Sequence, residues 1–160
     1  MPKLYGQPCP VACALDLLGD RWTLLLVRDL LKGRTRFHEF VESLPGIAPN
    51  ILSDRLKHLE EYGLVSRRLY SEHPPRAEYL LTDRGRELRM VIGALGAWGA
   101  KHANAPNTPV HAECGHPVDV VYRCPSCAEQ LTPDAVELRR GAAQVAGPTV
   151  LHPDDVVLSR

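Results

Sequence analysis

The chain of 160 residues has no long apolar run. A membrane-spanning helix needs about 20 consecutive apolar residues, and no stretch approaches that length. The amino terminus, MPKLYGQPCP, also lacks the apolar segment of a secretory signal peptide. Hydrophobic residues make up 44% of the chain and charged residues 24%, the balance of a globular protein. We therefore expect a cytoplasmic protein with no membrane partner, built from one ordinary domain and a small appendage.

The chain also has no net charge, because 19 Lys and Arg residues balance 19 Asp and Glu residues. A neutral chain is not expected to bind polyanions indiscriminately. The two parts of the chain differ slightly, however. Residues 1–104 carry 15 basic against 12 acidic side chains, and residues 105–160 carry 4 against 7. This asymmetry permits nucleic acid binding by the first part without demonstrating it.

Cysteine is scarce and odd in number, with 5 residues in two groups. Cys9 and Cys13 lie near the start, and Cys114, Cys124 and Cys127 lie near the end. Without an export signal a disulfide framework is not expected, because cytosolic thiols are kept reduced. Metal binding and thiol chemistry are the better interpretations.

The first quarter of the chain predicts three helices. The first covers residues 11–18 and the second covers residues 21–31, with Asp20 as its N-cap and Trp22 in the core. The third is short, RFHEFVESL at residues 36–44, and its apolar residues follow the spacing of a single buried stripe.

A longer amphipathic helix is predicted at PNILSDRLKHLEEYG, residues 49–63, with Leu52, Leu56 and Leu59 as its buried line. The segments LVSRRLY and AEYLLT then alternate in polarity around a turn with two prolines, which predicts a β-hairpin. Helical spacing resumes through Leu88 and ends before a linker, NAPNTP.

The outer face of the helix at 49–63 is polar, with side chains from Asn50, Ser53, Lys57 and two acidic residues, and with Arg55 on its flank. A solvated surface is the simplest interpretation of such a face. The order of elements favours another one. A short helix, a tight turn, a longer helix and a hairpin with a basic flank are typical of a winged helix-turn-helix.

The side chains of this face suit DNA. Asn50 and Ser53 can read base edges in the major groove, and Arg55 and Lys57 can reach bases or phosphates. Arg34 and Arg36 precede the short helix and could bind phosphates. Arg76, at the hairpin tip, could follow the DNA backbone or enter the minor groove. For each cation, an ordinary solvated position remains the alternative. The acidic residues on the same helix predict modest, salt-sensitive affinity.

Three stretches resemble the HxlR-type winged helix regulators of bacteria, which are related to the MarR group. They are CPVACALDLLGDRWTLLLVRDLLKGRTRFHEF, GIAPNILSDRLKHLEEYGLVSRRLY and PPRAEYLLTDRGREL, within about residues 9–101. The resemblance implies a mainly α fold with a small β-hairpin and a homodimer formed through terminal helices. It also implies binding to an inverted-repeat operator in double-stranded DNA, and transcriptional control rather than catalysis.

Cys9 occupies a position where many members of this family carry a cysteine, which in some of them responds to oxidants, electrophiles or aldehydes. A thiol near a helix amino terminus has its thiolate favoured by the helix dipole. The alternative is a small buried apolar side chain, an interpretation that is stronger for Cys13. Cys9 is thus a candidate thiol sensor.

The segment HAECGHPVDVVYRCPSC predicts a zinc-ribbon-like structure. His111 with Cys114, and Cys124 with Cys127, form two ligand pairs separated by a strand-like stretch. His116 competes with His111 as the fourth ligand. The segment has too little apolar content to fold alone, so zinc would supply much of its stability. Free thiols and a redox pair at Cys124 and Cys127 are the alternatives.

The sequence therefore predicts a winged helix DNA-binding and dimerisation domain over residues 1–104, a zinc-ribbon-like segment over 105–140 and a tail over 141–160. The expected function is that of a homodimeric repressor released by a small-molecule or thiol signal. The alternative is a metal-dependent protein interaction module without specific DNA binding. An enzyme is not expected, because the chain has no phosphate loop and no nucleophile elbow.

Overall fold

The computed structural model describes residues 4–73 and 75–137, and these form two units that meet in sequence between Arg89 and Met90. The tail predicted over residues 141–160 lies outside the described residues. The domain limits predicted at residues 104 and 140 stay predictions.

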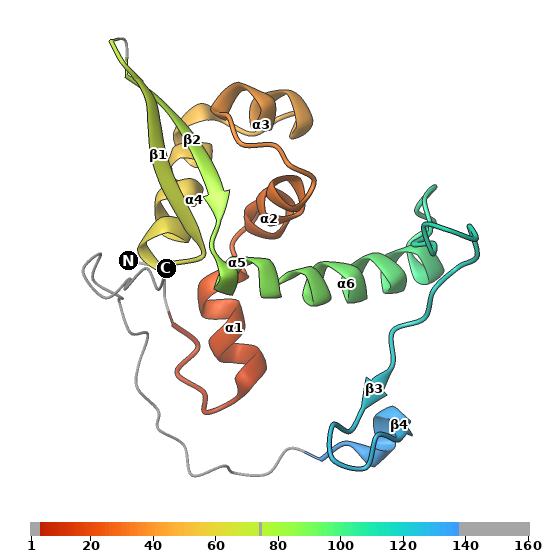
Figure 1. Ribbon diagram of the computed structural model, residues 1–160. Helices are drawn as coiled ribbons and strands as arrows, with labels where there is room; N and C mark the ends of the chain where they lie inside the picture. The colour runs from red at the N-terminus through yellow and green to blue at the C-terminus, as the bar shows by residue number, and fades with distance from the viewer. Residues whose placement is uncertain (1–3, 74, 138–160) are drawn as a thin grey trace. The chain divides into compact units, whose positions relative to one another are not determined.

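The first unit begins with four helices: α1 (Pro10–Leu18), α2 (Thr23–Leu31), α3 (Phe37–Ser43) and α4 (Pro49–Glu61) (Figure 1). These are the four helices that the apolar spacing predicts. Proline stands at the first position of α4, where its missing N–H group leaves no helical hydrogen bond unmade. The turn between α3 and α4 passes through Gly46 at φ +90°, a conformation that favours glycine.

The start of α2 differs from its prediction. Its N-cap is Trp22, at φ +80°, and not Asp20. The Asp20 carboxylate instead pairs with the guanidinium of Arg55 on α4, so a tertiary ion pair has replaced the local cap. Trp22 is half-buried rather than a core residue, and the guanidinium carbon of Arg21 lies 4.9 Å from its ring centroid.

The core of this unit lies where α2, α3 and α4 meet. Leu26, Phe40, Leu52 and Leu59 are each 0% exposed, and Leu56 is 1% exposed. Full burial of one such side chain contributes about 1.5–3 kcal/mol to folding. The predicted buried line of α4 is therefore confirmed. On α3 the stripe is narrower than predicted, because Val41 is 38% exposed.

The wing is an antiparallel hairpin of β1 (Val65–Glu72) and β2 (Pro75–Leu81), with an irregularity in register between Leu69 and Ser71. A third backbone segment joins it, which the sequence pattern did not predict. Arg36 forms an isolated bridge with Glu78, and the Tyr79 N–H group donates to the Thr35 carbonyl at 2.8 Å. β2 thus has a backbone neighbour on both edges. The tip of the β1–β2 hairpin projects beyond the helices (Figure 1).

A short helix, α5 (Asp83–Glu87), fastens the base of the wing. Its N-cap, Thr82, accepts a hydrogen bond from the Gly85 N–H group and donates one to the Gly63 carbonyl at 2.7 Å. A Cβ atom at Gly85 would lie 2.0 Å from the Leu64 carbonyl oxygen, so only glycine allows this contact. The helical pattern breaks once at Leu88, which separates α5 from α6.

The second unit contains α6 (Arg89–His102) from Met90 onward, two short strands, β3 (Tyr122–Arg123) and β4 (Gln130–Leu131), and a 3-10 turn, η1 (Pro133–Ala135). No residue of α6 is buried, and Met90 and Trp98 are 71% and 62% exposed. Within the described part of the chain, none of the helices has both the length and the apolar character to span a bilayer.

Candidate nucleic-acid interface

The outer face of α4 presents the polar side chains that the helical spacing places there. Asn50, Ser53, Asp54 and Lys57 are all exposed. Asn50 and Ser53 lie in the first turns of the helix, where unpaired backbone N–H groups and the helix dipole favour negative charge nearby. Lys57 lies one turn further on, and its ammonium group is 3.6 Å from the exposed Glu61 carboxylate. Such an exposed pair is weak and leaves the lysine available for phosphate.

Arg55 lies on the flank of α4 and faces the protein. Its side chain is 23% exposed, and its guanidinium pairs with Asp20. The neighbouring His58 ring is hydrogen bonded to the Leu17 carbonyl at 3.0 Å, so both side chains connect α4 to the end of α1 and the loop after it. A DNA contact by Arg55 stays a prediction, but this guanidinium already has a partner within the fold.

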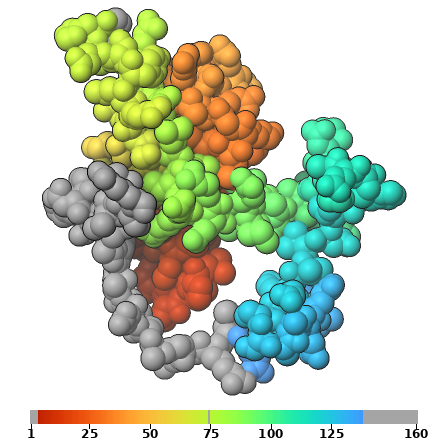
Figure 2. Space-filling model, viewed as in Figure 1, coloured from red at the N-terminus to blue at the C-terminus, as the bar shows by residue number. Residues whose placement is uncertain are grey.

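An open hollow lies between the start of α3 and the wing, and basic side chains gather in it. Arg36, Arg67 and Arg76 all line it, together with His38 and Tyr70. The guanidinium carbon of Arg36 is 5.0 Å from the Tyr70 ring centroid, a cation–π contact that orients this arginine. Figure 2 shows the wing and the α3 region side by side at the surface. Three cations from three separate segments therefore converge on one surface.

Arg67 is a member of this cluster that the sequence analysis missed. Alternation along β1 places Arg67 and Arg68 on opposite faces of the hairpin. Arg68 is occupied by an ion pair with Glu78 at 2.5 Å, whereas Arg67 opens onto the hollow. The available signal was the pair of adjacent arginines, since one of two neighbours on a strand must face each side.

The backbone of Arg36 is held in place by a capping interaction at the start of α3. The N–H groups of Arg36 and Thr35 donate to the Glu39 carboxylate at 2.8 and 2.7 Å. These two hydrogen bonds, first that of Arg36 and then that of Thr35, lower the pKa of Glu39. The cap thus fixes the point at which Arg36 enters the hollow.

Arg34 takes part in a separate network around Asp29, whose side chain is only 1% exposed. Arg28 binds the Asp29 carboxylate at 2.9 Å, Arg34 lies 3.6 Å from it, and the Ser43 hydroxyl donates to it. A buried carboxylate requires such partners. Arg34 is half-exposed, so it both stabilises the α2–α3 junction and reaches the surface.

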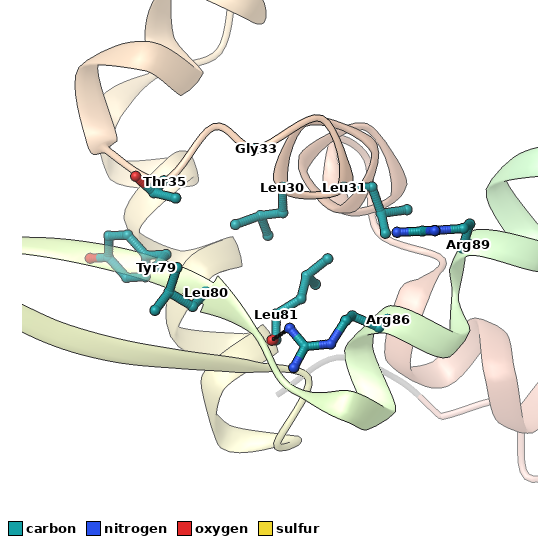
Figure 3. Close-up of a pocket in the computed structure, with 9 residues that line it drawn as sticks. All are labelled: Leu30, Leu31, Gly33, Thr35, Tyr79, Leu80, Leu81, Arg86 and Arg89. Atoms are coloured by element: carbon teal, nitrogen blue, oxygen red, sulfur yellow. Dashed lines mark hydrogen bonds between the residues drawn. The ribbon is translucent and has the colours of Figure 1, made fainter. Parts of the chain in front are cut away.

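A small pocket lies between the end of α2, β2 and α5 (Figure 3). Leu30 and Leu81 face each other across it, and Arg86 stands at its edge. The Arg86 guanidinium donates to the Leu81 carbonyl at 2.7 Å and to Asp83 at 2.9 Å. Its charge is therefore used within the fold, and the pocket by itself does not identify an effector.

The early cysteines occupy different environments. Cys9 is half-buried and is the N-cap residue of α1. Cys13, for which burial was the favoured interpretation, is exposed, and its sulfur lies 3.8 Å from the Gln7 carbonyl oxygen. The apolar pattern of α1 misled here because much of this helix faces outward in the single chain.

The predicted zinc ligands lie in two pairs. The His111 Nδ1 atom is 3.1 Å from the Cys114 sulfur. In the second pair, hydrogen bonds from the Cys127 and Ser126 backbone N–H groups, and then from the Cys127 thiol, lower the pKa of Cys124. Across the described ranges, no group of three or more His, Cys, Asp or Glu side chains is placed to hold a metal ion. The two pairs are therefore present but are not joined.

Known proteins that resemble this chain in sequence are described as helix-turn-helix proteins. The model of the HxlR-like helix-turn-helix family matches residues 17–107. Mb3122 of Mycobacterium bovis, an uncharacterised HTH-type transcriptional regulator, is 40% identical over 126 residues, which cover 76% of this chain and 79% of that protein. Another uncharacterised HTH-type transcriptional regulator, sll1512 of Synechocystis, is 41% identical over 95 residues, covering 59% of this chain and 70% of that protein.

Solved structures agree with these relatives. PA1607, provisionally described as a transcription factor, superposes with a TM-score of 0.71 at 37% identity, over 85% of this chain and 97% of that one. The redox regulator HypR in its reduced form superposes with a TM-score of 0.57 at 34% identity, over 60% of this chain and 95% of that one.

Proposed function

Because the chain belongs to the HxlR-like helix-turn-helix family and is a transcriptional regulator with a winged helix DNA-binding fold, we propose that it is a homodimeric repressor. It binds an inverted-repeat operator and leaves it on a small-molecule or thiol signal. The observation that carries the DNA contact is the convergence of Arg36, Arg67 and Arg76 on one hollow beside the wing. The family's regulators are not enzymes, and the interaction-module alternative is not favoured.

In this proposal α4 is the recognition helix. Its exposed Asn50 and Ser53 contact base edges in the major groove, and Lys57 contacts a phosphate. Two copies place their α4 helices in successive major grooves, about 34 Å apart along the DNA. Arg55 contributes indirectly, because its ion pair with Asp20 holds α4 in position.

The arginines of the hollow supply the phosphate contacts, which do not depend on the DNA sequence. Guanidinium groups bind phosphate oxygens in a fixed geometry, and each phosphate neutralised adds about −0.9 to the slope of log affinity against log salt. Arg76 stands one residue from the tip of the wing, opposite Ser71 in the register, and can follow the DNA backbone beyond the major groove.

Dimer formation is supported by α6. Its apolar side chains are exposed in the single chain, and Met90, Leu95 and Trp98 are 71%, 49% and 62% exposed. Exposed apolar residues in this number along one helix are typical of an interface. A second copy that packs against α6 would bury them and relate the two α4 helices by a two-fold axis.

A thiol signal is supported by Cys9, which combines partial exposure with a place at the amino terminus of a nine-residue helix. HypR, a similar protein, is a redox regulator described in both a reduced and an oxidised form. Oxidation of Cys9 would then alter the packing of α1 and release the operator. A small-molecule effector is the other signal of this proposal.

The test is binding of the reduced protein to its own upstream intergenic DNA, measured by fluorescence anisotropy against random DNA. Asn50→Ala should weaken operator binding by about 1–3 kcal/mol and leave random DNA unchanged. Arg67→Ala and Arg76→Ala should weaken both DNAs alike and reduce the salt slope by about one each. Arg68→Ala is the matched control, because Arg68 is paired with Glu78 and does not line the hollow.

Two results would contradict the proposal. Equal affinity for the upstream and random DNA would reject sequence-specific regulation. Equal effects of Arg67→Ala and Arg68→Ala would show that the hollow does not contact DNA. Release by diamide in a Cys9→Ser variant would reject Cys9 as the sensor while leaving DNA binding intact.

A further inference from the structure

Two turns of six residues in the second unit have the same backbone structure, although only part of their sequence is shared. The first is HAECGH at residues 111–116, and the second is CPSCAE at residues 124–129. Each one closes a small antiparallel hairpin. Val110 bridges Pro117 on either side of the first turn, and Arg123 pairs with Gln130 on either side of the second.

The hydrogen bonds inside the two turns also correspond. In each turn the N–H group of position one donates to the carbonyl of position six. This bond joins His111 to His116 and Cys124 to Glu129, both at 2.9 Å. In each turn the N–H group of position five donates back to the carbonyl of position one, from Gly115 at 2.8 Å and from Ala128 at 2.9 Å.

Position five has a positive φ in both turns, +73° at Gly115 and +61° at Ala128. Glycine adopts this conformation freely, but alanine adopts it rarely. The second turn therefore keeps the backbone geometry of the first, although alanine is unfavourable at this position.

The equivalence of the turns identifies which side chains correspond. His111 matches Cys124 at position one, and Cys114 matches Cys127 at position four. His116 matches Glu129 at position six, where the backbone carbonyl closes the hairpin. This correspondence favours His111 over His116 as the partner of Cys114 in a metal site. Tetrahedral zinc holds neighbouring nitrogen and sulfur ligands roughly 3.5 Å apart, and the His111 Nδ1 and Cys114 sulfur are 3.1 Å apart.

We propose that these two turns together bind one zinc ion in a closed structural site formed by His111, Cys114, Cys124 and Cys127. Three sulfur ligands and one nitrogen ligand complete a tetrahedron and leave no open position for catalysis. The described residues hold the four ligands as two separate pairs, so coordination must bring the turns together. Metal binding and folding of this segment are then a single coupled process.

Both turns belong to the same chain in this site. Residues 117–123 connect them, and an extended connection of this length spans at most about 25 Å. Such a short tether gives each turn a high effective concentration near the other, about millimolar or above, which favours ligands from one chain over ligands from two. Between residues 103 and 137 none is buried, so little packing opposes this approach.

The test is zinc content of the full-length protein after dialysis, together with the visible spectrum after cobalt substitution. We expect one zinc per chain and the absorption bands of tetrahedral cobalt with thiolate ligands. His111→Ala, Cys114→Ser and Cys127→Ser should lose the metal. His116→Ala is the matched control and should keep it. Circular dichroism of each variant establishes that the helices are still folded.

Three results on the separate proteins would overturn the proposal. These are no zinc uptake, an octahedral cobalt spectrum, or loss of zinc in His116→Ala with retention in His111→Ala. An equimolar mixture of Cys114→Ser and Cys127→Ser proteins should bind no zinc, and recovery of binding would overturn a site within one chain. None of these measurements uses DNA, so failure here is distinct from failure of the proposed regulator.

Discussion

The two units of this protein are stabilised in different ways. Among the described residues, every buried apolar side chain lies between Ala12 and Leu81, in the first unit. From Met90 onward no described residue is buried, and Pro109, Cys124 and Leu131 are the half-buried residues of the segment after α6. The first unit therefore carries its own core, whereas the second must obtain stability elsewhere.

Hydrogen bonds cannot make up this difference. Residues 103–137 contain well-formed turns, but a typical hydrogen bond contributes only about 0.5–1.5 kcal/mol to stability. Fixing the backbone of one residue costs about 1–2 kcal/mol. A segment with turns and no core is thus not stable alone. The proposed zinc ion and the proposed dimer partner would supply the stability that the second unit lacks by itself.

The largest expected effect comes from opening the core of the first unit. Leu52→Ala should lower its free energy of unfolding by about 2–5 kcal/mol, because the side chain is fully buried and leaves a cavity. Leu69→Ala is the control, since Leu69 is 51% exposed, and it should change stability by less than about 0.5 kcal/mol. Urea denaturation followed by circular dichroism measures both. Similar losses would show that the core is not where the structure places it.

Zinc removal tests how the second unit is stabilised. A chelator should raise the rate of proteolysis within residues 105–137 by more than about tenfold, because the turns would lose the proposed zinc cross-link. The helices of the first unit should melt at an unchanged temperature, since their core contains no metal ligand. Mass spectrometry of the fragments locates the cuts. Cuts in α2 or α4 at the same rate would mean that the two units share one stabilising core.

A smaller effect is expected at position five of the two turns. Ala128→Gly should tighten zinc binding by about fivefold, or ~1 kcal/mol, because glycine removes the cost of a positive φ. Gly115→Ala should weaken it by a similar factor for the same reason. Competition with a chromophoric chelator measures both affinities. Changes of the same sign would reject the equivalence of the turns.

The smallest effect concerns Glu39 and acid. Its pKa is lowered in the folded state by backbone N–H groups, so its contribution is fully present above the unfolded pKa of about 4.3. The contribution is lost as pH falls through the lower folded pKa. The folding stability of Glu39→Gln should therefore fall less steeply below about pH 4 than that of the unchanged protein. The substitution should not change how the second unit responds to acid. Acid titration of the two proteins, followed by tryptophan fluorescence, compares them.

The sequence predicted the elements of the first unit well, since their signals are local. Leu52, Leu56 and Leu59 follow one helical face, and the two predicted strand segments lie largely within β1 and β2. The family resemblance rests on the same stretches. Predictions failed where a distant partner decided the outcome. Asp20 caps no helix because Arg55, 35 positions away in the chain, takes its carboxylate.

The proposed DNA-binding residues also divide into those that local pattern places and those that only distant contacts place. The outward positions of Asn50, Ser53 and Lys57 follow from helical periodicity alone. Arg67 could not be chosen over Arg68 from sequence, because only the pairing of β1 with β2 shows which of them meets Glu78. Likewise, the proposal of His111 rather than His116 as a zinc ligand rests on the hydrogen bonds of the two hairpin turns, which the sequence does not show.

The sequence by itself therefore determined the order and type of the elements, the polar face of α4 and the spacing of the two pairs of His and Cys residues, because each depends on residues close together in the chain. Only the tertiary structure decided which arginines are already paired, how Arg36, Arg67 and Arg76 converge, and why Gly85 is required beneath the wing. Those features depend on contacts between distant segments, which packing selects and local propensity does not record.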